Sequence, residues 1–257
     1  MIILDCESIE TMYESVESVT GINRSELNEF FDGFDMDKFY EENSNFDEPA
    51  DRLLLSKVRE MENCNIRQID AVYWFHLSRT YKGNSFNQGI LSLGEAIDHI
   101  WYFLYDLQNG HVSKEEWDDF RYKKFVESKS HSAWLYHFKL GDKSHWGPYA
   151  MLVRDIAFVS KEVGNHDYLD APEIVEDICH VFDGMYQFNL LEKFKQKTYP
   201  CIVKFQSGQS KDYYLGIVLN FLYHKYHEME MSLNCNTCFD SEGESIEFDQ
   251  ILNVEFI

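Results

Sequence analysis

The stretch from residue 71 to residue 94 constrains the fold more than any other part of the chain. Its first residues, AVYWF, are aromatic or β-branched and are typical of a buried β-strand. The run ends on His76, Ser78 and Arg79, and a polar loop containing glycine follows. Gly89 and an apolar pair then lead into a segment with helical spacing. The sequence therefore predicts a strand, a loop and a helix in succession, which is a common way to present polar groups at a sheet edge.

Apolar residues at helical spacing predict further helices along the chain. Ser113 and Glu116 have the spacing of a capping box, and Pro172 predicts the start of another helix. The residues that carry the apolar spacing are Leu53, Leu54, Val58 and Met61; Ile97, Ile100, Trp101 and Leu104; Ile174, Ile178, Val181, Phe182 and Met185; and Ile217, Val218, Phe221 and Leu222.

Shorter apolar runs predict strands between and after these helices. Residues 128–146 are polar and predict a region that includes loop. Because helices do not regularly separate the strands, the pattern indicates an α+β fold rather than a doubly wound sheet. The strand predictions are residues 201–205, a strand fed by the turn at Gly147, and two tail strands over residues 229–233 and 246–256 joined by a turn at 240–244.

Composition and charge limit the class of protein. The 257 residues are 44% hydrophobic, enough for a substantial core, and carry a formal net charge of −22. Such a charge repels phosphate backbones, so it disfavours broad affinity for nucleic acid, although a local basic groove stays open. No stretch has the ~20 apolar residues of a membrane span. With six scattered cysteines, the expectation is a cytoplasmic protein with reduced thiols and no membrane partner.

The negative charge is concentrated at the N-terminus. Residues 1–50 hold 14 acidic residues against Arg24 and Lys38, a net of −12. Two interpretations stand: solvated helices that cover one side of the protein, or a detachable acidic segment that occupies a basic cleft or binds a protein partner. We expect an acidic helical segment over residues 1–68 and a second domain over residues 69–257.

Four residues near the C-terminus are candidate zinc ligands. His224 and His227 are three positions apart, and Cys235 and Cys238 have a spacing found in zinc sites. Bringing the four together would require an unusual bend, because the histidines fall on a helix and the cysteines on an alternating strand. Ordinary thiols and surface histidines are the favoured interpretation, and no metal is expected.

The strand–loop–helix stretch also resembles a known family. Its letters H-L-S-R-T, followed by F-N-Q-G-I-L-S-L-G, are similar to the first motif of the ADP-ribosyltransferase superfamily, in which poly-ADP-ribose polymerases carry H-G-S-R-T and then G-I-L-S-x-G-L. Leu77 stands where that motif has glycine, and the loop here is longer. Gly147-Pro-Tyr149-Ala150 is similar to the second motif, G-x-Y and a small residue at the start of a strand.

The resemblance implies a fold and a set of site residues. The implied fold is a split antiparallel sheet flanked by helices. NAD, as substrate, would be held by His76, Ser78, Arg79 and Gly89, with Arg79 on the pyrophosphate and Tyr149 packed on the nicotinamide ring. The implied catalytic set is His76, Tyr149 and Glu230, the last taken from the E-x-E at residues 228–230. Glu228, Glu242 and Glu244 are the alternatives for the catalytic glutamate.

The function implied by the resemblance is transfer of ADP-ribose from NAD to a macromolecule. Cleaving the nicotinamide–ribose bond passes through an oxocarbenium-like centre, which a nearby carboxylate stabilises. The chain is similar to bacterial toxin and phage-defence members of the superfamily, and the acceptor is protein or nucleic acid. Two other functions stay open: a non-catalytic interaction protein on the same fold, and an enzyme that only hydrolyses NAD.

Overall fold

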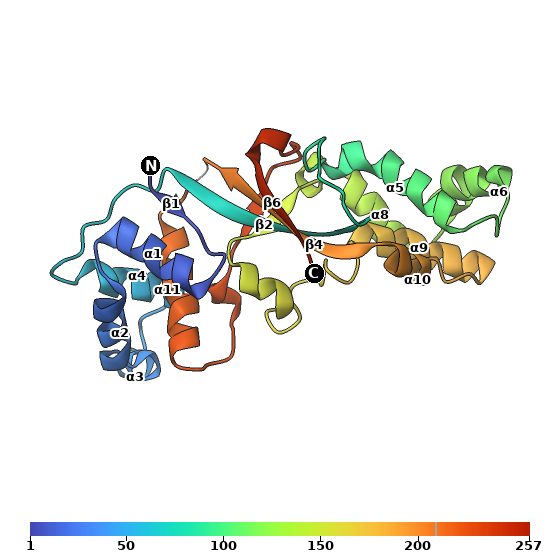
Figure 1. Ribbon diagram of the computed structural model, residues 1–257. Coiled ribbons are helices and arrows are strands. Elements are labelled where there is room, and N and C mark those ends of the chain that lie inside the picture. The colour runs from blue at the N-terminus through green and yellow to red at the C-terminus, as the bar shows by residue number, and fades with distance from the viewer. Residues whose placement is uncertain (209) are drawn as a thin grey trace. The chain divides into compact units, whose positions relative to one another are not determined.

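The protein is an α+β protein built on a mixed sheet, seen in the computed structural model in Figure 1. The structure describes residues 1–208 and 210–257. The strand order is β5-β3-β2-β4-β6, and β1 pairs with β2 off this path. The strands are β1 (Ile3–Leu4), β2 (Ala71–Thr80), β3 (Tyr149–Met151), β4 (Tyr199–Ser207), β5 (Cys238–Asp240) and β6 (Ile251–Phe256).

β2 is the strand predicted from the aromatic run, and it continues through the polar motif to Thr80. β1 runs parallel to it, with Ile3 beside Ala71. β3 runs antiparallel to it, with Phe75 opposite Met151. Buried residues predominate in the first half of β2, because this part of the strand lies inside the sheet. His76 and Ser78 therefore lie within the strand, where its pairing fixes their direction.

Contacts divide the chain into two units, and each one mixes distant parts of the sequence. Unit 1 comprises residues 1–75, 150–165 and 204–239, and unit 2 comprises residues 76–149, 166–203 and 240–257. This division differs from the expected boundary between residues 68 and 69. The acidic N-terminal residues share unit 1 with later segments, and the two-domain boundary stays a prediction.

Unit 1 is organised around one nearly completely buried helix, α11 (Tyr213–Tyr226). It lies beside α1 and α4 (Figure 1), which contact it together with α2. The Trp74 ring meets Tyr214 edge-on, with centroids 5.2 Å apart. The other helices of unit 1 are α1 (Ile9–Thr20), α2 (Arg24–Gly33), α3 (Met36–Glu42) and α4 (Ala50–Arg59), with short 3-10 turns at Arg154–Phe158 and Leu233–Cys235.

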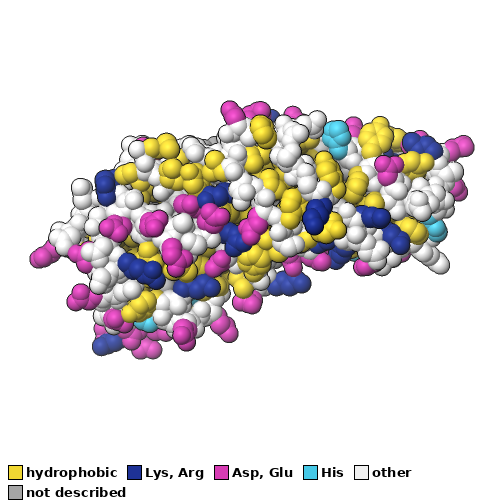
Figure 2. All heavy atoms as spheres, in the orientation of Figure 1, with side chains coloured by type: hydrophobic (Ala, Val, Ile, Leu, Met, Phe, Trp, Pro, Cys, Tyr) yellow, Lys and Arg dark blue, Asp and Glu magenta, His cyan; other side chains and the backbone are white. Residues whose placement is uncertain are grey.

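The acidic segment is helical, and its apolar face forms part of the core of unit 1. Met12, Val16 and Phe31 are fully buried there, whereas Asp and Glu side chains are frequent on the face shown in Figure 2. Tyr223 Oη donates a hydrogen bond to the Phe34 carbonyl at 3.0 Å, which links α11 to the residue after α2. The segment is therefore integrated into unit 1, which favours the interpretation of solvated helices over that of a detachable arm. A protein partner for it stays a prediction.

Unit 2 has an aromatic core. Trp101 is surrounded edge-on by Trp117, Phe120, Phe125 and Tyr136, and its Nε1 donates to Tyr136 Oη at 2.9 Å. The helices around this core are α5 (Leu93–Leu107), α6 (Lys114–Asp119), a π-helical turn (Phe120–Lys124), α7 (Phe125–Glu127), α8 (His131–Gly141), α9 (Glu173–Tyr186) and α10 (Leu190–Lys197), with 3-10 turns at Lys143–His145 and Phe248–Gln250.

Several predicted features are confirmed and one is wrong. The capping box at Ser113 is present, and α5, α9 and α11 lie where their apolar spacing predicted helices. Residues 128–146 include loop at 128–130 and at 142, as expected, but most of them form helix, in α8 and the following 3-10 turn. Residues 229–233 do not form a strand, and the first tail strand is β5 instead. None of the helices in the described residues is long and apolar enough to span a membrane.

Close approach of α4 and α11 requires glycine at position 216. A Cβ added there would lie 2.5 Å from the Asp51 carbonyl oxygen, whereas a Cβ added at helical Gly184 meets nothing within 4 Å. We expect Gly216→Ala to lower the free energy of unfolding by about 1–3 kcal/mol, because α4 must shift. Gly184→Ala should raise it by about 0.5–1 kcal/mol, since alanine favours the helix. Urea denaturation of both variants checks this, and a stabilised Gly216→Ala would contradict it.

Candidate functional site

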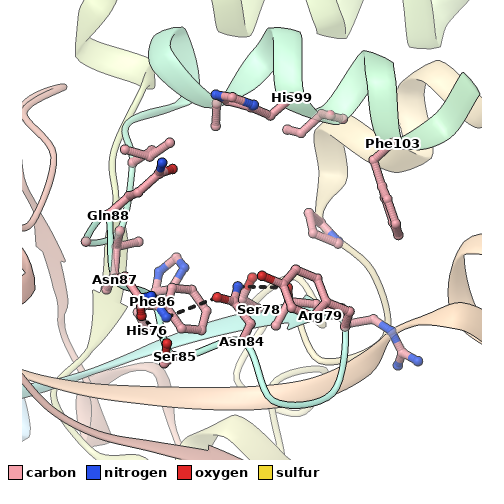
Figure 3. Close-up of a pocket in the computed structure, with 18 of the residues that line it drawn as sticks. His76, Ser78, Arg79, Asn84, Ser85, Phe86, Asn87, Gln88, His99 and Phe103 are labelled. Atoms are coloured by element: carbon pink, nitrogen blue, oxygen red, sulfur yellow. Dashed lines mark hydrogen bonds between the residues drawn. The ribbon is translucent and has the colours of Figure 1, made fainter. Parts of the chain in front are cut away.

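A cavity of about 810 Å³ lies in unit 2, beside the second half of β2. This volume falls in the range of ~300–1,000 Å³ that small-molecule and cofactor sites occupy. One wall is β2 with the loop that follows it, and the opposite wall is α5 (Figure 3). The residues that line it are His76, Ser78, Arg79, Thr80, Tyr81, Gly83, Asn84, Ser85, Phe86, Asn87, Gln88, Gly89, Ile90, Leu91, Ala96, His99, Ile100, Phe103, Pro172, Val175 and Phe194.

The loop at residues 81–91 is shaped by its own hydrogen bonds. Asn84 Nδ2 donates to Thr80 Oγ1 at 3.0 Å, and Asn84 Oδ1 accepts from the Phe86 N–H at 3.0 Å. At the end of the loop, Ile90 and Ile246 exchange two backbone hydrogen bonds of 2.9 Å. The loop is therefore fixed at both ends, and its amide and hydroxyl side chains line one wall of the cavity.

Gly89 is required by the backbone of this loop. Its φ is +77°, and a Cβ at this position would collide with the Ile246 carbonyl oxygen. Gly89 lines the cavity, and its role in holding NAD stays a prediction. The backbone bridge between Ile90 and Ile246 explains why the structure needs glycine at this position.

His76 is half-buried at the point where β2 meets β3. Its Nδ1 donates a hydrogen bond to the Tyr149 carbonyl oxygen at 2.8 Å, which leaves Nε2 as an acceptor in the neutral ring. Burial lowers the pKa of His76 below its usual value, with the hydrogen bond to Tyr149 opposing the shift. The side chain is therefore suited to hold a ligand hydroxyl as a neutral hydrogen-bond acceptor.

Arg79 lines the cavity, but its guanidinium is engaged by the protein itself. The guanidinium lies away from the cavity (Figure 3) and donates to the carbonyls of Leu169, Lys195 and Thr198 at 2.8–3.0 Å. Nε donates to Thr198 Oγ1 at 3.2 Å. The fork of donors that was expected to hold a pyrophosphate thus binds main-chain oxygens next to α9 and α10. Arg79 acts here as a positioning residue.

The aromatic side chain of Tyr149 is not among the residues that line the cavity. It is 38% exposed, and its hydroxyl donates to the Ser144 carbonyl at 3.1 Å. Burial raises its pKa, and the nearby carboxylates of Asp240 and Glu173 add to this. Tyr149 is next to His76 through its main chain, and its predicted stacking role is not part of this cavity.

The predicted glutamates lie apart from the lining residues. Glu228 and Glu230 belong to unit 1, where they follow α11 in a segment without strand structure, and the Glu230 carbonyl accepts from His224 Nδ1 at 2.6 Å. Glu242 and Glu244 lie on the turn before β6, with Glu244 paired to Lys143 at 2.5 Å. None of these carboxylates lines the cavity.

The four candidate zinc ligands near the C-terminus are not assembled as a site among the described residues. His227 Nε2 donates to the Phe31 carbonyl at 3.2 Å, away from Cys235. Among the residues that the structure describes, no group of three or more His, Cys, Asp or Glu side chains is placed to hold a metal ion. His224 and Cys235 do interact: hydrogen bonding to His224 and Ser232 lowers the pKa of the Cys235 thiol, outweighing the burial that raises it.

Sequence reasoning missed the wall contributed by α5. His99 and Phe103 are four positions apart, so they share one face of the helix next to the apolar face that predicted it. In Figure 3 both are placed across the cavity from His76 and Ser78. The only sequence signal was this i, i+4 pair on a helix launched directly from the loop.

Comparisons with protein-family models, with curated proteins and with solved structures found no match for this chain.

We predict that Arg79 stabilises unit 2 through its geometry rather than through its charge alone. Arg79→Lys should lower the free energy of unfolding by about 1–3 kcal/mol, because a single ammonium group cannot serve three carbonyls and a hydroxyl. The matched control Arg52→Lys, at an exposed position of α4, should change it by less than about 0.5 kcal/mol. Equal effects in denaturant titrations of the two variants would contradict this role.

The lowered pKa of His76 predicts a pH dependence of stability. The folded protein favours the neutral ring of His76 more strongly than the unfolded chain does, in which the ring has its usual pKa of 6.5. The unfolded state then binds more protons in mild acid, so this contribution is complete above about pH 6.5 and is lost as the pH falls below it. Between about pH 7.5 and about pH 5.5, His76→Asn should lose less stability than the parent protein. Denaturant titrations at both pH values measure this, and parallel losses would contradict it.

Proposed function

We propose that the protein binds NAD in the cavity beside β2 and transfers ADP-ribose from it to a macromolecular acceptor. The observation that carries the proposal is the position of the cavity. The residues that resemble the first motif of ADP-ribosyltransferases, His76, Ser78 and Gly89, line a space of about 810 Å³ together with the loop and helix that follow them. The split antiparallel sheet of that superfamily is part of the proposal.

The charge of the cavity also supports an anionic ligand. The chain carries 45 acidic residues, yet none of the described residues that line the cavity is Asp or Glu. A pyrophosphate there would meet amide, hydroxyl and backbone N–H groups without a facing carboxylate. A dinucleotide site in a strongly acidic protein requires a lining without carboxylates, because these would repel the phosphates.

Individual residues have definite tasks in this proposal. His76 Nε2 accepts a hydrogen bond from a ribose hydroxyl, and Ser78 donates or accepts at the same sugar. Asn84, Asn87 and Gln88 supply neutral amide donors for the phosphates. Phe103 offers an aromatic surface for a heterocyclic ring. Arg79 takes part only by holding the walls in place.

The reaction would break the bond between nicotinamide and ribose and form a bond from the same ribose carbon to the acceptor. Nicotinamide leaves as a neutral molecule, and the acceptor nucleophile loses a proton. A carboxylate must stabilise the positive charge that develops on the ribose. Glu230 stays the predicted residue for this task, with Glu228, Glu242 and Glu244 as alternatives.

A non-catalytic NAD-binding or interaction protein is the second candidate function. The specific observation in its favour is that the described lining of the cavity contains no carboxylate. A site of this composition holds an anion without supplying the group that stabilises an oxocarbenium-like centre. NAD hydrolysis without an acceptor needs the same carboxylate and is separated from transfer by its product.

We predict that changes at the cavity weaken NAD binding. His76→Ala and Ser78→Ala should each weaken it by roughly 5- to 30-fold in calorimetric titrations, the effect of a lost hydrogen bond of about 1–2 kcal/mol. The matched control His180→Ala, at an exposed position of α9, should bind as the parent does. If circular dichroism shows that His76→Ala fails to fold, the NAD affinity of Ser78→Ala alone tests the proposed site. NAD binding that no cavity variant weakens would overturn the proposed site.

Chemistry is tested separately with adenylate-labelled NAD and a cell lysate. Glu230→Gln, Glu228→Gln, Glu242→Gln and Glu244→Gln should all bind NAD, and one of them should lose nicotinamide release. Label on protein or nucleic acid supports transfer, and free labelled ADP-ribose supports hydrolysis. NAD binding without nicotinamide release by the parent protein would favour the non-catalytic function.

A further inference from the structure

A second and much smaller cavity lies in unit 1, where the ends of three helices meet. Val19 comes from the end of α1, Arg59 is the last residue of α4, and Leu215 lies in the first turn of α11. Residues 66–69, in the loop before β2, and residues 210–212 complete the lining. The volume of the cavity is about 30 Å³. One water molecule needs ~10–15 Å³, so there is room for a group of a few atoms and not for a nucleotide.

Three basic side chains from three different segments line this cavity. They are Arg59, Arg67 and Lys211, and we call them the basic triad. Among the described residues of the lining Asp212 alone is acidic, which leaves a net charge of +2 in a chain of −22. No residue of the triad forms an ion pair with any part of the chain that the structure describes. The three charges are therefore available to a ligand.

Hydrogen bonds hold the segments that carry the triad in place. The Arg67 N–H donates to the Val19 carbonyl at 2.8 Å, and Arg67 Nη2 donates to the Glu17 carbonyl at 3.1 Å. Ser210 Oγ donates to the Ile69 carbonyl at 2.9 Å, which ties the start of α11 to the same loop. A guanidinium has five N–H donors, so Arg67 keeps most of them for a ligand. Because the walls are already fixed, binding does not have to order them first.

The position of Lys211 is electrostatically unfavourable in the free protein. Lys211 comes two residues before α11, and the N-terminus of a helix carries the positive end of its dipole. The side chain of the N-cap residue Asp212 makes no capping hydrogen bond to the first turn. Arg59 differs, since a cation at the end of α4 is stabilised by the dipole of that helix. An anion in the cavity would interact favourably with the triad and with the start of α11 together.

We propose that this cavity binds a phosphate group, either as inorganic phosphate or as the monoester of a small molecule. Guanidinium groups match phosphate oxygens with paired hydrogen bonds, and an ammonium group adds a point charge. Three cationic side chains from different segments need more acceptor oxygens than the two of a carboxylate, and a phosphate supplies them. The small volume admits the phosphate group, while the rest of a monoester stays in solvent. This inference does not depend on the proposed function, because the triad belongs to unit 1 and the proposed NAD site to unit 2.

Isothermal titration calorimetry of the full chain with inorganic phosphate, at constant ionic strength, tests the inference. We expect Arg59→Ala and Lys211→Ala each to weaken binding by roughly five-fold to thirtyfold, the effect of one lost charge-assisted contact. The matched controls are Arg52→Ala on α4 and Lys225→Ala on α11. Both side chains are exposed on the same two helices and neither lines the cavity, so both controls should bind phosphate as the parent does.

Thermal denaturation supplies a readout that a purely structural role of the triad would not give. Phosphate should raise the melting temperature of the parent protein and of both controls, because it binds the folded state. The melting temperature of Lys211→Ala should respond little to phosphate. Without phosphate this variant should be at least as stable as the parent, because a cation has been removed from the start of α11.

Further titrations separate the two sources of the phosphate group. If glycerol 3-phosphate binds at least as tightly as inorganic phosphate and requires the triad, the ligand is a monoester, whereas tighter binding of inorganic phosphate identifies the free ion. The inference is overturned if acetate binds as tightly as phosphate, or if the triad variants bind phosphate as tightly as the two controls do. It is also overturned if the parent protein does not bind phosphate at millimolar concentrations.

Discussion

The walls of the cavity depend on the guanidinium of Arg79. It reaches from β2 to the carbonyl of Leu169 before α9 and to the carbonyls of Lys195 and Thr198 at the end of α10. The last carbonyls of a helix have no partner within it, and a cation there also interacts favourably with the helix dipole. One side chain therefore satisfies the end of α10 and fixes Phe194, which lines the cavity. The same contact holds the strand that carries His76 and Ser78 to the end of α10.

Separation of charge is the second constraint on the molecule. The described residues that line the cavity in unit 2 include no Asp or Glu, although each of the two units carries more acidic than basic residues. Coulomb interactions between exposed groups are screened within about 10 Å at ordinary salt. A net charge of −22 thus says little about any one surface of the protein. Local composition, rather than the total, decides which ligands each surface attracts.

The sequence predicted correctly those helices whose apolar side chains face the core. α5, α9 and α11 have inward-facing apolar residues at regular spacing, and the capping box at Ser113 is a local signal, so these features were predictable. α8 was missed because two of its largest rings, Trp134 and Phe138, face solvent and hide the helical pattern. The partners of Arg79 were not predictable, because every residue has a main-chain carbonyl and the sequence does not show which of them accept hydrogen bonds from Arg79.

Binding a dinucleotide and cleaving it make opposite electrostatic demands on a site. The pyrophosphate favours surroundings without carboxylates, and the lining of the cavity meets this demand. The oxocarbenium-like centre favours a carboxylate close to the ribose, which raises the cost of binding if it also faces the phosphates. An enzyme reconciles the two by placing one carboxylate at the sugar end and keeping the phosphate end neutral. In the proposed NAD site His76 would mark the sugar end, because the Tyr149 carbonyl fixes the orientation of its ring and leaves Nε2 to accept a hydrogen bond from a hydroxyl. The location of a carboxylate relative to His76 is therefore what separates an NAD-binding protein from a transferase.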